Sequence, residues 1–173
     1  MKLGEMGFTC IELVVAMTIM VLVGGAAGIA TFQVLKGTEH NSNHMTAVRQ
    51  VQNAGYWISH DAQMAQSVTA DELTSPDFLI LSWTDGDSGD ECQVVYTLED
   101  MPEAGLKALM RNQSINGGES STTFIAQYID SDSEKSKCEF ISGTLSLTIT
   151  AKVGDGPQME SETRTYQLVP RSG

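Results

Sequence analysis

A long apolar run near the start of the chain predicts a membrane-spanning helix. The 23 residues from Leu13 to Leu35 include no charged side chain. Because a helix rises about 1.5 Å per residue, this run is long enough to cross a hydrocarbon core of roughly 30 Å. Only a helix fits there, since lipid leaves open backbone groups unsatisfied. The alternatives are a plain signal anchor and a secretory signal peptide, for which Ala26-Ala27-Gly28 would serve as the cleavage site.

A second helical pattern follows the apolar run. Apolar or small residues recur at steps of three and four: Val48, Val51, Gly55, Ile58, Ala62 and Ala65. This spacing predicts an amphipathic helix that continues the first one across residues 36–68. Its apolar face needs a partner, which the rest of the chain must supply.

Residues 69–173 are predicted to form a β-rich head. Alternating apolar and polar residues predict six strands, at 78–83, 92–98, 106–113, 123–129, 144–151 and 163–169. The segment 106–113 also suits a short helix. An acidic turn at 85–91, a charged loop at 130–137 and a glycine-rich turn at 154–157 separate strands. One long N-terminal helix followed by an antiparallel sheet is an α+β fold, in which the sheet covers the helix face.

Composition narrows the classes of partner. The formal net charge is -12. Nucleic-acid surfaces and anionic lipid both attract basic patches, so we expect no nucleic-acid partner and no docking on anionic lipid. A solvated acidic surface on an exported protein fits this charge. The sequence contains no metal-ligand spacing, phosphate-binding glycine loop or nucleophile motif, and we do not expect an enzyme.

A lone carboxylate, Glu12, lies at the start of the apolar run. A carboxylate in a spanning helix costs about 2.5 to 3.5 kcal/mol near the bilayer centre, and less near an interface. Such residues usually have a partner, and the next basic residue, Lys36, lies at the far end of the run. We therefore expect the partner on another molecule. A free amine at Phe8, produced by a cut after Gly7, would serve.

The residues around this carboxylate carry a family resemblance. The segment Gly7-Phe8-Thr9-Cys10-Ile11-Glu12-Leu13-Val14-Val15-Ala16 resembles the class III signal of type IV prepilins and type II secretion pseudopilins. The resemblance implies that a prepilin peptidase/methyltransferase cuts after Gly7 and N-methylates Phe8. It also implies that Glu12 neutralises the amine of a neighbouring subunit during assembly. Cys10 stands where the family usually has leucine.

The order of segments in the head is similar to that of the J-type minor pseudopilins. The resemblance implies a pilin-like fold with a leader at 1–7, a transmembrane and filament-core helix at 8–35, a stalk helix at 36–68 and a head at 69–173. It implies a single-pass protein of the cytoplasmic membrane, with its N-terminus inside and its head outside, that enters an extracytoplasmic filament. Its implied partners are other pilin or pseudopilin subunits and an inner-membrane assembly platform. A type IV pilus pilin and a membrane-anchored binding protein that never polymerises are the alternatives.

Three further sets of residues are candidates for packing, cross-linking or metal binding. Gly24 and Gly28 form a small-xxx-small pair that permits close helix packing, although glycine is common in membrane helices anyway. Cys92 and Cys138 fall in the part expected outside the cytoplasm, where a disulfide would stabilise by about 3 to 4 kcal/mol; two free thiols are the alternative. The acidic turn offers calcium candidates without an EF-hand pattern, and a solvated turn is the simpler interpretation. These candidates are Asp85, Asp87 and Asp90.

Overall fold

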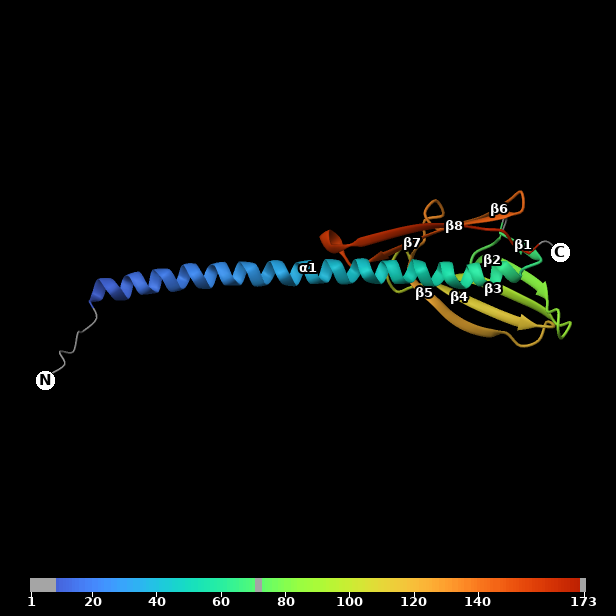
Figure 1. Ribbon diagram of the computed structural model, residues 1–173, viewed down its shortest axis with the longest axis horizontal. Helices are drawn as coiled ribbons and strands as arrows, with labels where there is room; N and C mark the ends of the chain where they lie inside the picture. The colour runs from blue at the N-terminus through green and yellow to red at the C-terminus, as the bar shows by residue number, and fades with distance from the viewer. Residues whose placement is uncertain (1–8, 71–72, 172–173) are drawn as a thin grey trace. The chain divides into compact units, whose positions relative to one another are not determined.

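The computed structural model describes residues 9–70 and 73–171 (Figure 1). It confirms the α+β class, with one long N-terminal helix followed by antiparallel strands. The internal contacts divide the chain into two units, Met1–Asn41 and Ser42–Gly173. We call the second of these the head unit.

A single helix, α1 (Cys10–Met64), covers both predicted helical segments. It ends earlier than the predicted residue 68. The reason is a backbone hydrogen bond, because Gln66 N donates to Ser82 O at 2.9 Å and draws the chain into an extended segment. That segment is a short strand, β1, which the alternation of residues did not predict.

All six predicted strands are confirmed, including 106–113 as a strand rather than a helix. The sheet also holds two strands that were not predicted, β1 and β6. A single turn of 3-10 helix, η1 (Gly156–Gln158), precedes the last strand. The strands are β1 (Ser67–Thr69), β2 (Asp77–Thr84), β3 (Glu91–Asp100), β4 (Leu106–Ile115), β5 (Ser121–Asp130), β6 (Lys137–Ile141), β7 (Thr144–Val153) and β8 (Glu160–Leu168).

The strands form one antiparallel half-barrel. They follow the order β1-β2-β3-β4-β5-β7, and β8 pairs with β7 along its whole length. The other edge of β7 is shared, because β5 meets it only at Ile129↔Ala151 while β6 pairs with its first half. As a result the sheet curves around the head-unit part of α1, with β4 and β5 on one side and β7 and β8 on the other (Figure 1).

The core of the head unit lies between α1 and the concave face of the sheet. Small and branched residues on one stripe of the helix are fully buried, which confirms the predicted apolar face apart from the half-buried Val48. The strands contribute larger side chains from their inward-facing positions. The stripe comprises Ala47, Val51, Ala54, Ile58 and Ala62, and the fully buried partners from the sheet include Leu79, Leu81, Leu109, Leu145, Leu147 and Ile149.

Gly55 brings α1 and β8 into close contact. Tyr166 of β8 packs directly over this glycine, and its hydroxyl donates to Val51 O at 3.1 Å. A Cβ added at Gly55 would overlap the Tyr166 ring. Glycine weakens a helix interior, so this position is explained by the close packing it permits.

A buried ion pair fastens the end of α1 to the sheet. Asp61 is 0% exposed and accepts hydrogen bonds from Arg111 Nε at 2.6 Å and Arg111 Nη2 at 3.1 Å. Tyr96 donates its hydroxyl to the same carboxylate at 2.6 Å, and the Arg111 guanidinium lies 5.3 Å from the centre of the Trp57 ring. Burial alone would lower the pKa of Arg111, but the contacts with Asp61 outweigh it and raise the pKa.

Candidate functional site

The start of α1 is a reciprocal capping box. Thr9 N and Thr9 Oγ1 donate to Glu12 Oε2 at 3.0 and 2.9 Å. In return, Glu12 N donates to Thr9 Oγ1 at 3.4 Å. Two donors that the first helical turn leaves open are satisfied in this way. Glu12 therefore stabilises the beginning of its own helix.

This finding corrects the expectation that Glu12 has no partner in its own chain. The partner is Thr9, a neutral residue, so the contact satisfies hydrogen bonds without cancelling the charge. The carboxylate remains exposed. Gly7 and Phe8, the predicted cleavage and methylation residues, lie outside the described part of the chain. The spacing Thr9-x-x-Glu12 is itself the signal that sequence reasoning missed.

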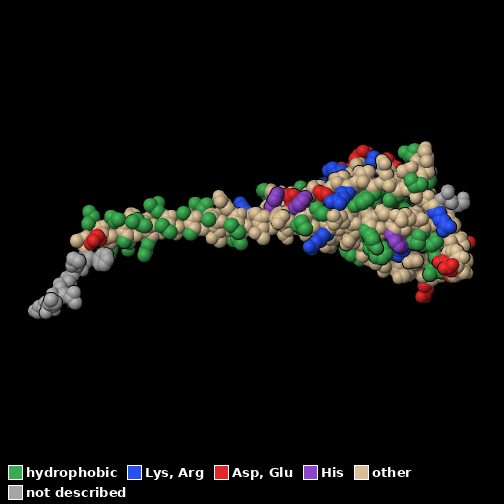
Figure 2. Space-filling view, in the orientation of Figure 1, with side chains coloured by type: hydrophobic (Ala, Val, Ile, Leu, Met, Phe, Trp, Pro, Cys, Tyr) green, Lys and Arg blue, Asp and Glu red, His purple; other side chains and the backbone are tan. Residues whose placement is uncertain are grey.

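The apolar part of α1 is long and apolar enough to cross a membrane, judged by length and composition. Figure 2 shows hydrophobic side chains distributed along this part of the helix. At Gly24 and Gly28 an added Cβ would meet nothing within 4 Å. Among the described residues, the space beside both glycines is thus open, and their role in helix packing stays a prediction.

The acidic turn between β2 and β3 uses some of its carboxylates to hold its own shape. Asp85 Oδ1 accepts hydrogen bonds from Asp87 N at 2.8 Å and Ser88 N at 3.1 Å. Asp90 Oδ1 accepts from Asn116 Nδ2 at 2.7 Å. These donors lower the pKa of both Asp85 and Asp90. Among the described residues, no group of three or more His, Cys, Asp or Glu is placed to hold a metal ion.

The expected disulfide between Cys92 and Cys138 is not formed, and both are free, buried thiols. Their strands, β3 and β6, are not neighbours in the sheet. Cys138 belongs to the hydrophobic core cluster, whereas Cys92 lies outside it. Burial raises the pKa of both thiols, and the charges of Asp85 and Asp90 add to the rise at Cys92.

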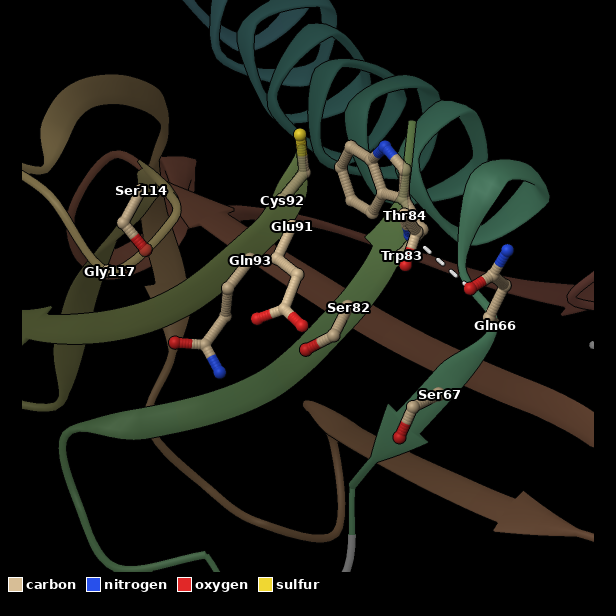
Figure 3. Close-up of a pocket in the computed structure, with 10 residues that line it drawn as sticks. All are labelled: Gln66, Ser67, Ser82, Trp83, Thr84, Glu91, Cys92, Gln93, Ser114 and Gly117. Atoms are coloured by element: carbon tan, nitrogen blue, oxygen red, sulfur yellow. Dashed lines mark hydrogen bonds between the residues drawn. The ribbon is translucent and has the colours of Figure 1, made fainter. Parts of the chain in front are cut away.

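A cavity of about 460 Å³ lies at the end of the head unit where β1, β2 and β3 run side by side. In Figure 3, Cys92 and Trp83 point towards α1, while Ser82, Glu91 and Gln93 point to the opposite face of the sheet. Trp83 thus packs against the core, and Gln66 Oε1 accepts a hydrogen bond from Thr84 N at 3.2 Å. The lining combines hydroxyl and amide groups with one thiol, one indole ring and a single carboxylate, Glu91.

A second ionic cluster stabilises the loop between β5 and β6. Asp130 is 3% exposed and its Oδ2 lies 2.7 Å from Lys152 Nζ and 3.5 Å from Lys135 Nζ. Burial alone would raise the pKa of Asp130, but Lys152, the amide of Asp132 and Lys135 together lower it. The cluster borders a cavity of about 730 Å³.

The lowered pKa of Asp130 predicts a loss of stability in acid. A carboxylate with a lowered folded-state pKa stabilises above its unfolded pKa, about 3.9, and loses that contribution as pH falls through the folded-state value. Unfolding by denaturant at a series of pH values should therefore show a decline below about pH 4 that Asp130→Asn reduces. At pH 7 the same variant should be less stable by about 1 to 3 kcal/mol. Asp87→Asn, which removes no ion pair, is the control. An unchanged acid decline in Asp130→Asn would contradict the assignment.

Sequence reasoning also missed the Asp61–Arg111 pair. The signal was present, because Asp61 follows Ile58 by three positions and so falls on the buried stripe of α1. Arg111 lies two positions after the buried Leu109 on β4, so its side chain belongs to the same inward face of the strand.

Comparison of the chain with protein-family models, with curated proteins and with solved structures found no match.

Proposed function

We propose that this chain is a prepilin-like subunit of an extracytoplasmic helical filament, most similar to a minor pseudopilin that initiates or caps a type II secretion pseudopilus. The observation that carries the proposal is the segment from Gly7 to Glu12, which leads into a helix with the length and composition to cross a membrane. In a plain anchor a neutral glutamine could make the capping contacts with Thr9, so the charge of Glu12 is the part that an anchor does not need.

The α+β head unit supports the same proposal. A pilin-like subunit needs a long N-terminal helix whose second part is covered by an antiparallel sheet, and α1 with its half-barrel has this arrangement. In the proposed role, the first part of α1 holds the subunit in the cytoplasmic membrane with the head outside. It then packs against the helices of other subunits in the filament. Gly24 and Gly28 present no side chain that would oppose this packing.

The proposed maturation involves a prepilin peptidase/methyltransferase, which would cut after Gly7 and methylate the new amine of Phe8. Glu12 would then face the Phe8 amine of a neighbouring subunit on the assembly platform. The capping box is compatible with this step, since Thr9 satisfies hydrogen bonds of the carboxylate but leaves its charge unbalanced. A charge without a counter-charge in lipid favours an ionic partner.

Replacing Glu12 with valine tests the proposal. We expect the full chain to be cut after Gly7 as in the wild type but to be nearly absent from filaments, because the intersubunit ion pair is lost. The measurement compares the sheared filament fraction with the membrane fraction, and mass analysis of the N-terminus verifies cleavage and methylation of Phe8.

Two further variants separate the charge of Glu12 from its capping role. Glu12→Gln keeps an oxygen that can accept from Thr9 but removes the charge, so it should also be excluded from filaments. Thr9→Val removes the capping hydroxyl, at about 1 kcal/mol of helix stability, but keeps the charge and should still be incorporated. Normal incorporation of Glu12→Val, or an intact Met1 on the mature chain, would refute the proposed function.

A further inference from the structure

The solvent-facing side of α1 in the head unit forms a continuous stripe without any carboxylate. Its exposed residues recur at helical spacing opposite the buried stripe. Tyr56 and His60 stack with ring centres 6.3 Å apart, and Tyr56 meets Trp57 edge-on at 6.0 Å. Aromatic residues and arginine are the types that dominate binding energy at protein interfaces. We call this surface the α1 stripe: Met45, Arg49, Gln52, Asn53, Tyr56, His60 and Gln63.

Arg49 stands out among the cations of an acidic unit. Residues 42–173 contain 8 Lys or Arg against 19 Asp or Glu. Most of these cations have an ion-pair partner within the chain, namely Lys107, Arg111, Lys135, Lys137, Lys152 and Arg164. Arg49 is exposed and forms no ion pair with any residue that the structure describes. Its charge is thus available to another molecule.

The acidic turn between β2 and β3 offers the complementary charge. Asp85 and Asp90 are engaged in the turn itself. The carboxylates of Asp87 and Glu91 are exposed and accept no hydrogen bond or ion pair from the part of the chain that the structure describes. Two free carboxylates therefore lie within five residues of one turn, in the densest acidic run of the sequence.

We infer that the α1 stripe of one copy binds the acidic turn of the next copy, with Arg49 opposite Asp87 and Glu91. The inference rests on the proposed filament, in the form in which copies of this chain adjoin one another rather than a single copy capping the end. The two surfaces are different parts of the same unit, so the contact is head-to-tail, and a head-to-tail contact that does not close into a ring extends into a filament. Opposite charges at this contact also offset the repulsion between two strongly acidic heads.

Charge reversal and its compensation in the full chain test this inference. Arg49→Glu, and separately Asp87→Arg with Glu91→Arg, should each lower the fraction of subunits in sheared filaments about tenfold, because like charges then face each other. Combining all three substitutions should return incorporation to within about twofold of the wild type. Glu99→Lys reverses an exposed charge at the end of β3 away from the acidic turn and should change nothing. Equal amounts in the membrane fraction, and equal protease resistance, verify that the variants fold.

Measuring Glu12→Val in parallel separates a failure of the inferred contact from a failure of the proposed filament function. If Arg49→Glu is incorporated normally, or the combined variant is no better than the single reversals, while Glu12→Val is excluded, the inferred surface is wrong and the filament role stands. If Glu12→Val is also incorporated normally, both are wrong. Loss on each reversal with recovery in the combination supports the contact.

Discussion

Replacing Arg111 with methionine is expected to lower the free energy of unfolding of the head unit by about 3 to 5 kcal/mol. The substitution keeps the length of the side chain but leaves Asp61 buried without its cation. Tyr96 would be the remaining close donor to that carboxylate, with His60 Nδ1 at 3.4 Å on its other side. One neutral hydroxyl does not offset the cost of burying a charge.

Denaturant unfolding of the full chain in detergent micelles measures this effect. Both tryptophans of the sequence, Trp57 and Trp83, lie in the head unit, so their fluorescence reports its unfolding even with the apolar N-terminal segment attached. Arg164→Met is the matched control. Its partner Glu162 is partly exposed, and such pairs contribute about 0 to 1 kcal/mol.

A triple substitution shows whether the loss of stability in Arg111→Met comes from leaving the Asp61 carboxylate buried without a cation. Combining Arg111→Met with Asp61→Leu and Tyr96→Phe removes the charge, its cation and the hydroxyl together. A buried ion pair is often replaceable by apolar residues of similar size, so the triple variant should recover most of the stability lost in Arg111→Met. A triple variant as unstable as Arg111→Met would show that shape, rather than charge, dominates at this site.

Gly55→Ala is expected to destabilise the head unit by about 1 to 3 kcal/mol, the cost typical of overpacking. Alanine favours a helix over glycine by up to about 1 kcal/mol, and at most helix positions this change would stabilise. Here the new methyl group displaces the Tyr166 ring and breaks its hydrogen bond to Val51 O. Thermal unfolding followed by circular dichroism shows whether Gly55→Ala lowers or raises the stability of the head unit.

A double-mutant cycle isolates the contact between the methyl group and the ring. In a Tyr166→Ala background the space over Gly55 is open, so Gly55→Ala should become neutral or stabilising. Asn53→Ala, on the exposed side of the same helix turn, controls for helix propensity alone. Destabilisation of equal size in both backgrounds would contradict the packing account.

The sequence predicted the α+β class and six of the eight strands. These strands could be predicted because apolar and polar residues alternate wherever one face of a strand is buried. It missed β1, which has only three residues, and β6, which lies between a charged loop and a tight turn. That turn, Ser142-Gly143, has φ values of 52° and 81°. Both values are positive, as a two-residue hairpin of type I′ requires. A Ser-Gly pair after five residues of Lys-Cys-Glu-Phe-Ile was therefore the available signal.

The candidate site was less accessible to sequence reasoning, because its contacts depend on three-dimensional pairing. The disulfide was expected from compartment alone, and the strand order later separated Cys92 from Cys138. An opposite charge was the expected partner of Glu12, whereas its partner in the structure is Thr9, a neutral residue three positions away. Periodicity placed Asp61 on a buried stripe, but its cation lies 50 residues further along the chain.

The contact between Tyr166 and Val51 also governs when the head unit can fold. The two residues are 115 positions apart in sequence, and synthesis at about 5 to 20 residues per second needs roughly 6 to 23 s to cover that distance. During this interval β8 has not been made. The apolar face of α1 that is buried in the folded head unit therefore lacks one of the strands that cover it. The newly made chain is therefore prone to aggregation for seconds, and protection by a chaperone would matter most in this period.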